Sequence, residues 1–295
     1  MDGGMRGVIV KGIGGFYSIR TDDGRVFILR ARGVFRKRKQ TPLIGDWVVF
    51  SPGEGEDEGW IDRIEPRKNE LIRPPVANVS YLIIVIAPVP KPDLLLVDML
   101  LADARRKNIE PVLVVNKSDL DFVFCGAIAG EYEATGDKVF IVSARKKTGL
   151  SALDSLMRAG ICCFAGQSGV GKSSLVTAIT GIALTAGAIS ERIERGRHTT
   201  RHAELIMQNG YQVLDTAGFS LLEKPEPEDP VMLKSYYPEF SEFESQCRFQ
   251  PCYHYSEPGC AVLKAAQEGR IAEGRVERYH QLLDKAKEAW KVRYE

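Results

Sequence analysis

A glycine-rich stretch in the middle of the chain, GQSGVGKS at residues 166–173, has the residue types and spacing of a phosphate-binding loop. It satisfies G-x-x-x-x-G-K-[ST] between an apolar strand, ICCFA, and a helical stretch, SSLVTAIT, and this context argues against a chance glycine-rich turn. Its backbone N–H groups can converge on phosphate oxygens at a helix N-terminus, where the dipole favours anions. We expect Lys172 to reach the β- and γ-phosphates and Ser173 to ligate Mg²⁺. The predicted phosphate-binding residues are Gly166, Gln167, Ser168, Gly169, Val170, Gly171, Lys172, Ser173 and Ser174.

Two short motifs at the ends of consecutive apolar runs could recognise guanine. N-K-S-D at residues 116–119 ends the run VLVV, and S-A-R at 143–145 ends the next run. An aspartate in the first motif can accept two hydrogen bonds from guanine N1 and N2, a donor pair that adenine lacks. Either motif alone is weakly specific, but two on consecutive strands are not. The predicted base-binding residues are Asn116, Lys117, Asp119, Ser143 and Ala144.

Two segments downstream of the loop could serve Mg²⁺ and the γ-phosphate. D-T-A-G at residues 215–218 ends a strand that follows a hairpin turn. We expect Asp215 to hold Mg²⁺ through a water and the Gly218 N–H to sense the γ-phosphate. The segment R-G-R-H-T-T-R at 195–201 lies where an effector segment must supply a threonine to the metal. Either Thr199 or Thr200 can be that ligand.

If the predicted site hydrolyses GTP, the residue that orients the attacking water must differ from the one that Ras-type enzymes use. Those enzymes orient the attacking water with a glutamine directly after D-x-x-G. This chain has Phe219 at that position, and its side chain cannot form a hydrogen bond with water. His198, beside the effector threonines, is the predicted catalytic residue. The alternatives are an exposed loop histidine or one that touches RNA. Several arginines lie nearby without a predicted role: Arg195, Arg197 and Arg201.

A cluster of cysteines near the C-terminus predicts a metal site. The segment CRFQPCYHYSEPGC has the spacing C-x4-C-x-H-x5-C, a Cys₃His set that suits tetrahedral Zn²⁺. Four protein ligands close the coordination sphere, so the zinc is expected to be structural. The predicted ligands are Cys247, Cys252, His254 and Cys260. The other three cysteines, Cys125, Cys162 and Cys163, are expected to lie in the core.

The guanine motif precedes the phosphate loop, the reverse of the order in an ordinary G-protein. A nucleotide site is assembled from loops at the carboxyl ends of parallel strands, so chain order is not part of its chemistry. If the chain of an ordinary G-domain is cut after the strand that ends in D-x-x-G, and its original N- and C-termini are joined, the motifs occur in the order found here. The joint is predicted where helix 150–158 runs into the strand 161–165. The D-x-x-G segment then leads directly into residues 221–295, so nucleotide state could pass to the C-terminal domain through the chain itself.

The pattern of elements predicts three domains. Five short strands with glycine-rich turns in residues 1–72 indicate a small barrel; we predict an OB-fold, although other small barrels fit almost as well. Strands alternating with helices in residues 73–222 predict a mainly parallel α/β sheet, that of a circularly permuted P-loop GTPase. Residues 223–295 are predicted to form a zinc-binding helical domain, with a helical tail from about 261 to 293.

Composition and charge set broader limits. A chain of 295 residues with 44% hydrophobic and 27% charged residues fits two or three globular domains. It contains no apolar segment of membrane-spanning length and no signal-peptide pattern, so we expect a cytoplasmic protein that does not bind membranes. Residues 30–39 hold six basic residues and no acid. That run is either a solvated loop or a contact with nucleic-acid phosphates.

Together these motifs closely resemble the ribosome small subunit-dependent GTPase A (RsgA) family of bacterial assembly factors. The resemblance covers nearly the whole chain, and GQSGVGKSSL, GRHTTRH, DTAGF and CRFQPCYHYSEPGCAV are its most specific stretches. It implies binding to the 30S subunit and its 16S rRNA late in maturation, near the decoding region, and weak GTP hydrolysis that the subunit stimulates. It also implies His198 as the catalytic histidine and the Cys₃His set as zinc ligands. The family usually has D-T-P-G, and Ala217 replaces that proline here.

The sequence thus predicts a monomeric GTP hydrolase that binds the 30S subunit with GTP and is released on hydrolysis to GDP. One alternative is a GTP-dependent binding switch that acts on another RNA or on a protein. Another is a metabolic kinase with a P-loop, although the N-K-x-D motif argues against it because that motif selects guanine without offering an acceptor site.

Overall fold

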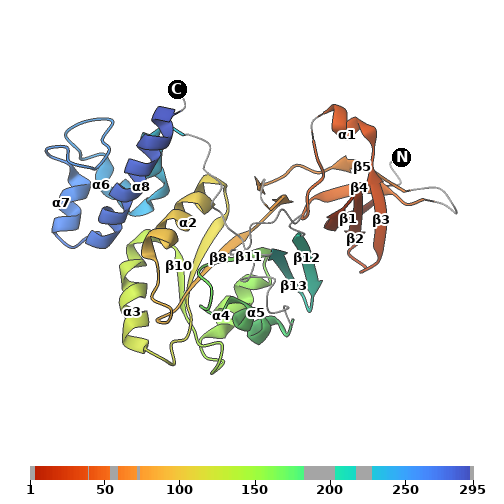
Figure 1. Ribbon diagram of the computed structural model, residues 1–295, viewed down its shortest axis with the longest axis horizontal. Helices are drawn as coiled ribbons and strands as arrows, with labels where there is room; N and C mark the ends of the chain where they lie inside the picture. The colour runs from red at the N-terminus through yellow and green to blue at the C-terminus, as the bar shows by residue number, and fades with distance from the viewer. Residues whose placement is uncertain are drawn as a thin grey trace.

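The computed structural model describes residues 4–38, 40–53, 59–71, 74–182, 203–216 and 228–292. Three units follow one another in space: a barrel, a central α/β unit and a C-terminal group of helices (Figure 1). Within these ranges, no helix combines the length and the apolar character needed to cross a membrane.

The N-terminal unit is a closed barrel of the five described strands, joined in the order β1–β2–β3–β5–β4–β1. All of these pairings are antiparallel except that of β3 with β5, and a short helix, α1, follows β3. Alternate side chains such as Ile19, Phe50 and Ile61 fill the interior and are fully buried. The OB-type barrel predicted from the strand pattern is present. Its elements are β1 (Met5–Ile13), β2 (Phe16–Arg20), β3 (Val26–Ala31), α1 (Gly33–Lys37), β4 (Trp47–Ser51) and β5 (Trp60–Ile64).

A short linker with a two-stranded hairpin, β6 (Glu70–Leu71) and β7 (Val76–Ala77), leads from the barrel to the α/β unit. Asp46 is fully buried there and accepts hydrogen bonds from the Arg67 guanidinium at 2.8 Å. The barrel also pairs directly with the edge of the central sheet, where Lys11 lies opposite Glu204. The two sheets are therefore continuous.

The central unit is a six-stranded sheet in the described part of the chain, in the order β10–β9–β8–β11–β13–β12. Every pairing in it is parallel except that of β12 with β13. The strand before the phosphate loop, β11, lies between β8 and β13, and β9, which carries N-K-x-D, lies one strand further along. Residues distant in the sequence are thus neighbours in the sheet. The strands are β8 (Tyr81–Ile86), β9 (Glu110–Val115), β10 (Lys138–Ile141), β11 (Ile161–Ala165), β12 (Ala203–Gln208) and β13 (Tyr211–Thr216).

Helices cover both faces of this sheet. Helices α2 and α3 pack on one face against side chains such as Leu82 and Leu113, and α4 and α5 pack on the other against Ile83 and Val114. Burial on both faces explains why the strands are continuous apolar runs. The three remaining cysteines, Cys125, Cys162 and Cys163, are fully buried in these cores, as predicted. The helices are α2 (Leu94–Arg106), α3 (Phe122–Glu131), α4 (Leu150–Met157) and α5 (Lys172–Thr180), with a 3₁₀ turn η1 (Glu133–Thr135).

The C-terminal unit has its own apolar core, which includes Phe240, Tyr279 and Leu283. The predicted helical tail is present as two helices, which separate near Gly269, a residue in a left-handed conformation with φ +72°. Helix α3 starts at Phe122, where the Asp121 carboxylate caps it by accepting from the Phe124 N–H at 2.9 Å. The elements are η2 (Pro230–Tyr236), η3 (Pro238–Phe240), α6 (Ser241–Glu244), α7 (Ala261–Gln267) and α8 (Glu273–Val292).

Candidate nucleotide site and metal centre

The phosphate loop runs from the end of β11 to the start of α5, in contact with two other segments. Gly166 has φ +127°, and a Cβ there would lie 2.1 Å from the Val85 carbonyl oxygen of β8. Gly171 has φ +95° and caps α5, and a Cβ there would lie 2.5 Å from Asn116 Nδ2. Only glycine fits both positions, so the loop backbone lies directly against its neighbours.

The loop lysine is buried among backbone carbonyls. Lys172 is 6% exposed, and its ammonium donates to the carbonyl oxygens of Gly166 and Gln167, each at 2.7 Å. Burial lowers the pKa of Lys172 to about 8. An anion beside the ammonium offsets this cost of burial, so the position suits a polyphosphate.

The N-K-x-D motif lies directly against the phosphate loop. The Asn116 side chain is buried; its Nδ2 donates to the Val170 carbonyl at 3.0 Å, and its Oδ1 accepts from the Ala144 N–H at 3.1 Å. The Lys117 ammonium donates to the Gly169 carbonyl at 2.6 Å. The predicted base-binding and phosphate-binding segments therefore meet at one edge of the sheet.

The Asp119 carboxylate is exposed at this site and is oriented by a hydrogen bond. The Ser143 hydroxyl donates to Asp119 Oδ1 at 2.5 Å, and this bond lowers the pKa of the carboxyl below its ordinary value. The serine is itself fixed, because it is fully buried and accepts from the Lys146 N–H at 3.0 Å. An ionised, exposed carboxylate in a fixed orientation is the acceptor that guanine N1 and N2 require.

The Asp215 side chain has a buried carboxylate oxygen on the strand next to the phosphate-loop strand. It lies near the end of β13, which pairs with β11, the strand that leads into the phosphate loop. Its Oδ1 is buried without a hydrogen-bond partner in the described part of the chain, and burial, followed by nearby Glu204, raises its pKa. A buried acceptor without a donor fits a metal-bound water. Four other predicted site residues lie outside the described residues: His198, Thr199, Thr200 and Gly218.

Two features of the site were not anticipated from sequence. An open hollow of about 510 Å³ lies beside the start of α5, lined by Lys147 together with Ser173, Ser174, Thr177 and Ala178. The Asp93 N–H, at the start of α2, donates to Gln167 Oε1 at 2.9 Å. The position of Lys147 shortly after the S-A-R motif could have indicated the hollow. No sequence signal marks the hydrogen bond between Asp93 and Gln167.

The Cys₃His residues form a compact, fully enclosed cluster. Their ligand atoms all lie within 4.8 Å of one another, and all four residues are buried. Cys247 Sγ lies 3.9 Å from Cys260 Sγ, and His254 Nδ1 lies 3.3 Å from Cys260 Sγ. Sulfur ligands at about 2.3 Å around tetrahedral zinc would be about 3.8 Å apart, so the cluster fits that metal.

The chemistry of the donor set also calls for a cation. Burial raises the pKa of the Cys252 thiol to about 12, and the pKa of Cys260 is raised for the same first cause. Thiolates in this core therefore need a compensating positive charge, which a bound divalent metal supplies. The Ala261 N–H, at the start of α7, already points at Cys247 Sγ at 3.4 Å.

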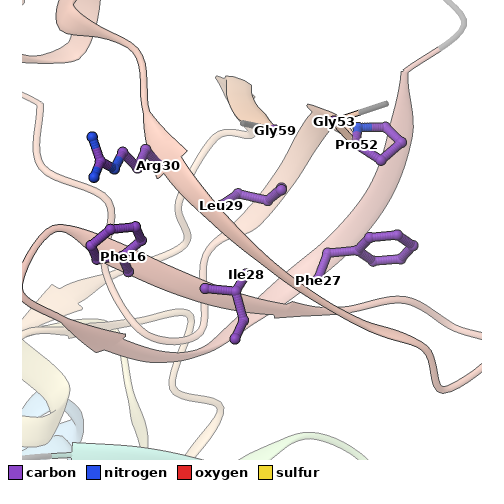
Figure 2. A pocket seen from close by; sticks show the side chains of 8 residues that line it. All are labelled: Phe16, Phe27, Ile28, Leu29, Arg30, Pro52, Gly53 and Gly59. Carbon is purple, nitrogen blue, oxygen red and sulfur yellow. The ribbon is translucent and has the colours of Figure 1, made fainter. Parts of the chain in front are cut away.

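A second hollow, of about 240 Å³, lies on the barrel and contains none of the nucleotide motifs (Figure 2). Its lining comes from β2, β3 and the segments next to β4 and β5. The Arg30 guanidinium lies 4.4 Å from the ring centre of Phe16 there. Arg32, in the same basic run, pairs with Asp62 at 2.7 Å, so part of the run's charge is neutralised within the barrel.

The strand order, with N-K-x-D packed on a phosphate loop that follows it in the chain, defines a circularly permuted GTPase. Family models for the RsgA GTPase and the RsgA N-terminal domain match residues 64–224 and 6–61. The chain belongs to the RsgA GTPase family and is a GTPase.

Known relatives and solved structures agree with this assignment over nearly the full chain. The "small ribosomal subunit biogenesis GTPase RsgA" of Ruminiclostridium cellulolyticum is 43% identical over 290 residues, which is 96% of this chain and 94% of that protein. The crystal structure of YloQ, described as a circularly permuted GTPase, matches with a TM-score of 0.80, 33% identity and coverage of 97% and 96% of the two chains. YjeQ from Thermotoga maritima matches with a TM-score of 0.82, 32% identity and coverage of 96% and 98%.

Asp119→Asn tests the role of the exposed carboxylate. GTP affinity should fall by about 100-fold, because two charge-assisted hydrogen bonds are lost, while xanthosine triphosphate should now bind. Competition binding with both nucleotides measures the change. Ser143→Ala, which removes only the supporting hydroxyl, should weaken GTP by about tenfold or less and gain no xanthine binding. Unchanged GTP affinity in Asp119→Asn would exclude this carboxylate from base recognition.

Cys252→Ser tests the metal centre. Protein purified without added metal should contain one zinc per chain by elemental analysis, and the variant should lose it. The C-terminal unit should then exchange its amide hydrogens faster, because the cluster lies in its core. GDP binding should persist within about tenfold, since the nucleotide motifs rest on a separate core. A metal-free chain with a protected C-terminal unit would contradict the assignment.

Proposed function

We propose that this GTPase acts in biogenesis of the small ribosomal subunit, binding the 30S subunit with GTP and leaving it on hydrolysis. The observation that carries the proposal is the direct contact of Asn116 and Lys117 with residues 166–173, because it brings the predicted base-binding and phosphate-binding motifs together. The name of the curated relatives supports the choice of partner.

We assign the nucleotide as follows. The base lies against Asn116, Lys117, Asp119 and the Ser143–Ala144 turn, and the phosphates lie along residues 166–174. Ser173, together with Thr199 or Thr200, would hold Mg²⁺, and Asp215 would contact it through water; bound there, the ion would supply positive charge to the phosphates. The loop N–H groups and Lys172 position the phosphates.

His198 is proposed to position the attacking water, since Phe219 cannot. Histidine can accept the proton of a water molecule near neutral pH, which a phenylalanine ring cannot do. The histidine lies next to the effector threonines in the chain, so the same segment would bring metal ligand and water-positioning group together.

The remaining assignments concern partners and organisation. We propose that the metal in the Cys₃His cluster is zinc, and that residues 1–72, 73–222 and 223–295 are the barrel, the GTPase domain and the zinc domain. The barrel is proposed to contact 16S rRNA through its basic run, where the side chains of Lys37 and Arg38 are exposed. The protein is proposed to act as a cytoplasmic monomer.

A GTPase assay with purified ribosomal subunits tests this function. Adding 30S subunits should raise the rate by about tenfold or more, because a partner that positions the catalytic residue completes the site. Equal amounts of 50S subunits or tRNA serve as controls and should leave the rate unchanged. Equal rates with all three would favour a GTP-dependent switch on another partner.

The same assay tests the histidine. His198→Ala should lower the 30S-stimulated kcat by about 100-fold or more, the range for one positioning or acid–base group, and leave GTP affinity unchanged. His202→Ala, in the same segment, is the matched control and should behave like the unaltered protein. If kcat is unaffected in His198→Ala, another group must position the attacking water.

A further inference from the structure

Helix α2 of the GTPase domain carries a buried aspartate that holds the C-terminal unit. Asp98 is fully buried and interacts with three side chains, each at 2.6 Å. One, the Tyr132 hydroxyl, comes from the GTPase domain, while the guanidinium groups of Arg275 and Arg278 come from α8. The last helix of the chain is thus fixed to α2 through ionic contacts in the interior.

The surrounding contacts make this junction specific. Arg275 also pairs with Glu239 at 2.6 Å and lies 4.5 Å from the Tyr237 ring centre, and Arg278 pairs with Glu131 at 2.6 Å. Loss of one partner would leave a buried charge unpaired, so the cluster strongly favours one orientation of α8 on α2.

Further contacts lie on both sides of the ionic cluster along α2. Leu95 and Met99 pack against the apolar core of the C-terminal unit. Towards the other end of the helix, the Arg105 guanidinium donates to the Tyr236 carbonyl at 2.7 Å. The C-terminal unit therefore contacts α2 along its length, and α8 lies beside α2 (Figure 1).

The N-terminus of the same helix contacts the phosphate loop. Asp93 is the cap of α2: its carboxylate accepts from the Leu96 N–H at 3.0 Å, and its own N–H donates to Gln167 Oε1 at 2.9 Å. Gln167 is part of the loop, and its carbonyl accepts from Lys172. One helix, α2, thus joins the buried ionic cluster to the residues around the nucleotide phosphates.

We propose that Arg278 is a positioning residue for nucleotide binding: by fixing the C-terminal unit on α2, it holds the capped first turn of that helix against Gln167 and so orders the phosphate loop. This rests on the phosphate-binding roles proposed above. Coupling between two sites is reciprocal, so bound nucleotide in turn tightens the docking of the C-terminal unit. The coupling works through α2 and is independent of the chain connection that follows Asp215.

A double-mutant cycle tests the coupling through the affinity for fluorescent GDP, using the full chain. Arg278→Ala and Gln167→Ala should each weaken binding by about three- to tenfold, the range for one hydrogen bond. If both act through the same contact, the double variant should bind within about twofold of the weaker single variant. The proposal would be overturned if Arg278→Ala bound GDP within twofold of the unaltered protein. It would also be overturned if the fold-losses in GDP affinity of the two single variants multiplied in the double variant.

Two controls separate positioning from damage. Lys264→Ala removes a charge from an exposed pair with Glu268 in the same unit, away from α2, and should leave GDP affinity unchanged. Metal content in Arg278→Ala should equal that of the unaltered protein. If Arg278→Ala does not fold, Arg278→Lys replaces it in the double-mutant cycle, with the same criteria. Lysine keeps the positive charge but cannot contact Asp98 and Glu131 at the same time as the guanidinium does. Failure of the unaltered protein to bind GDP would contradict the proposed function itself, whereas multiplying losses contradict only the coupling.

Discussion

The hydrogen bond from Asn116 to the Val170 carbonyl is the contact on which the nucleotide site depends. It joins the predicted base-binding motif to a phosphate loop that follows it in the chain, and the close approach requires Gly171, where a Cβ would lie 2.5 Å from the amide nitrogen. The sheet makes this possible, because β9, β8 and β11 run parallel and end at one edge. Chain order can change freely as long as these three strands keep their places.

The permutation also determines how the other domains attach. The barrel joins the sheet at the β12 edge, and β12 begins at Ala203, directly after the segment with the predicted effector threonines. The C-terminal unit follows D-x-x-G in the chain and packs on α2, far from that edge. The barrel is thus connected to the central sheet through a strand, and the C-terminal unit is connected to the predicted phosphate loop through α2 and its cap, Asp93.

Much of this could be predicted from sequence because the signals are local. The buried strands are continuous apolar runs, the loop glycines are fixed by spacing, and the Cys₃His set lies within one short segment. Pattern alone does not give the exact bounds of helices, which single residues set here: Asp121 caps α3, and Gly269 lies between α7 and α8 in the helical tail. The Asp98 cluster could not be predicted, because its partners on α8 are distant in sequence and only packing brings them together. The link between Asp93 and Gln167 depends on the exact start of a helix, which periodicity does not define.

A structure of the chain with Mg²⁺ and a non-hydrolysable GTP analogue tests the permuted site most directly. We predict the guanine edge within about 3 Å of the Asp119 carboxylate, and the phosphates along residues 166–173 at the N-terminus of α5. A nucleotide held elsewhere, or a base bound without contact to Asp119, would contradict the account.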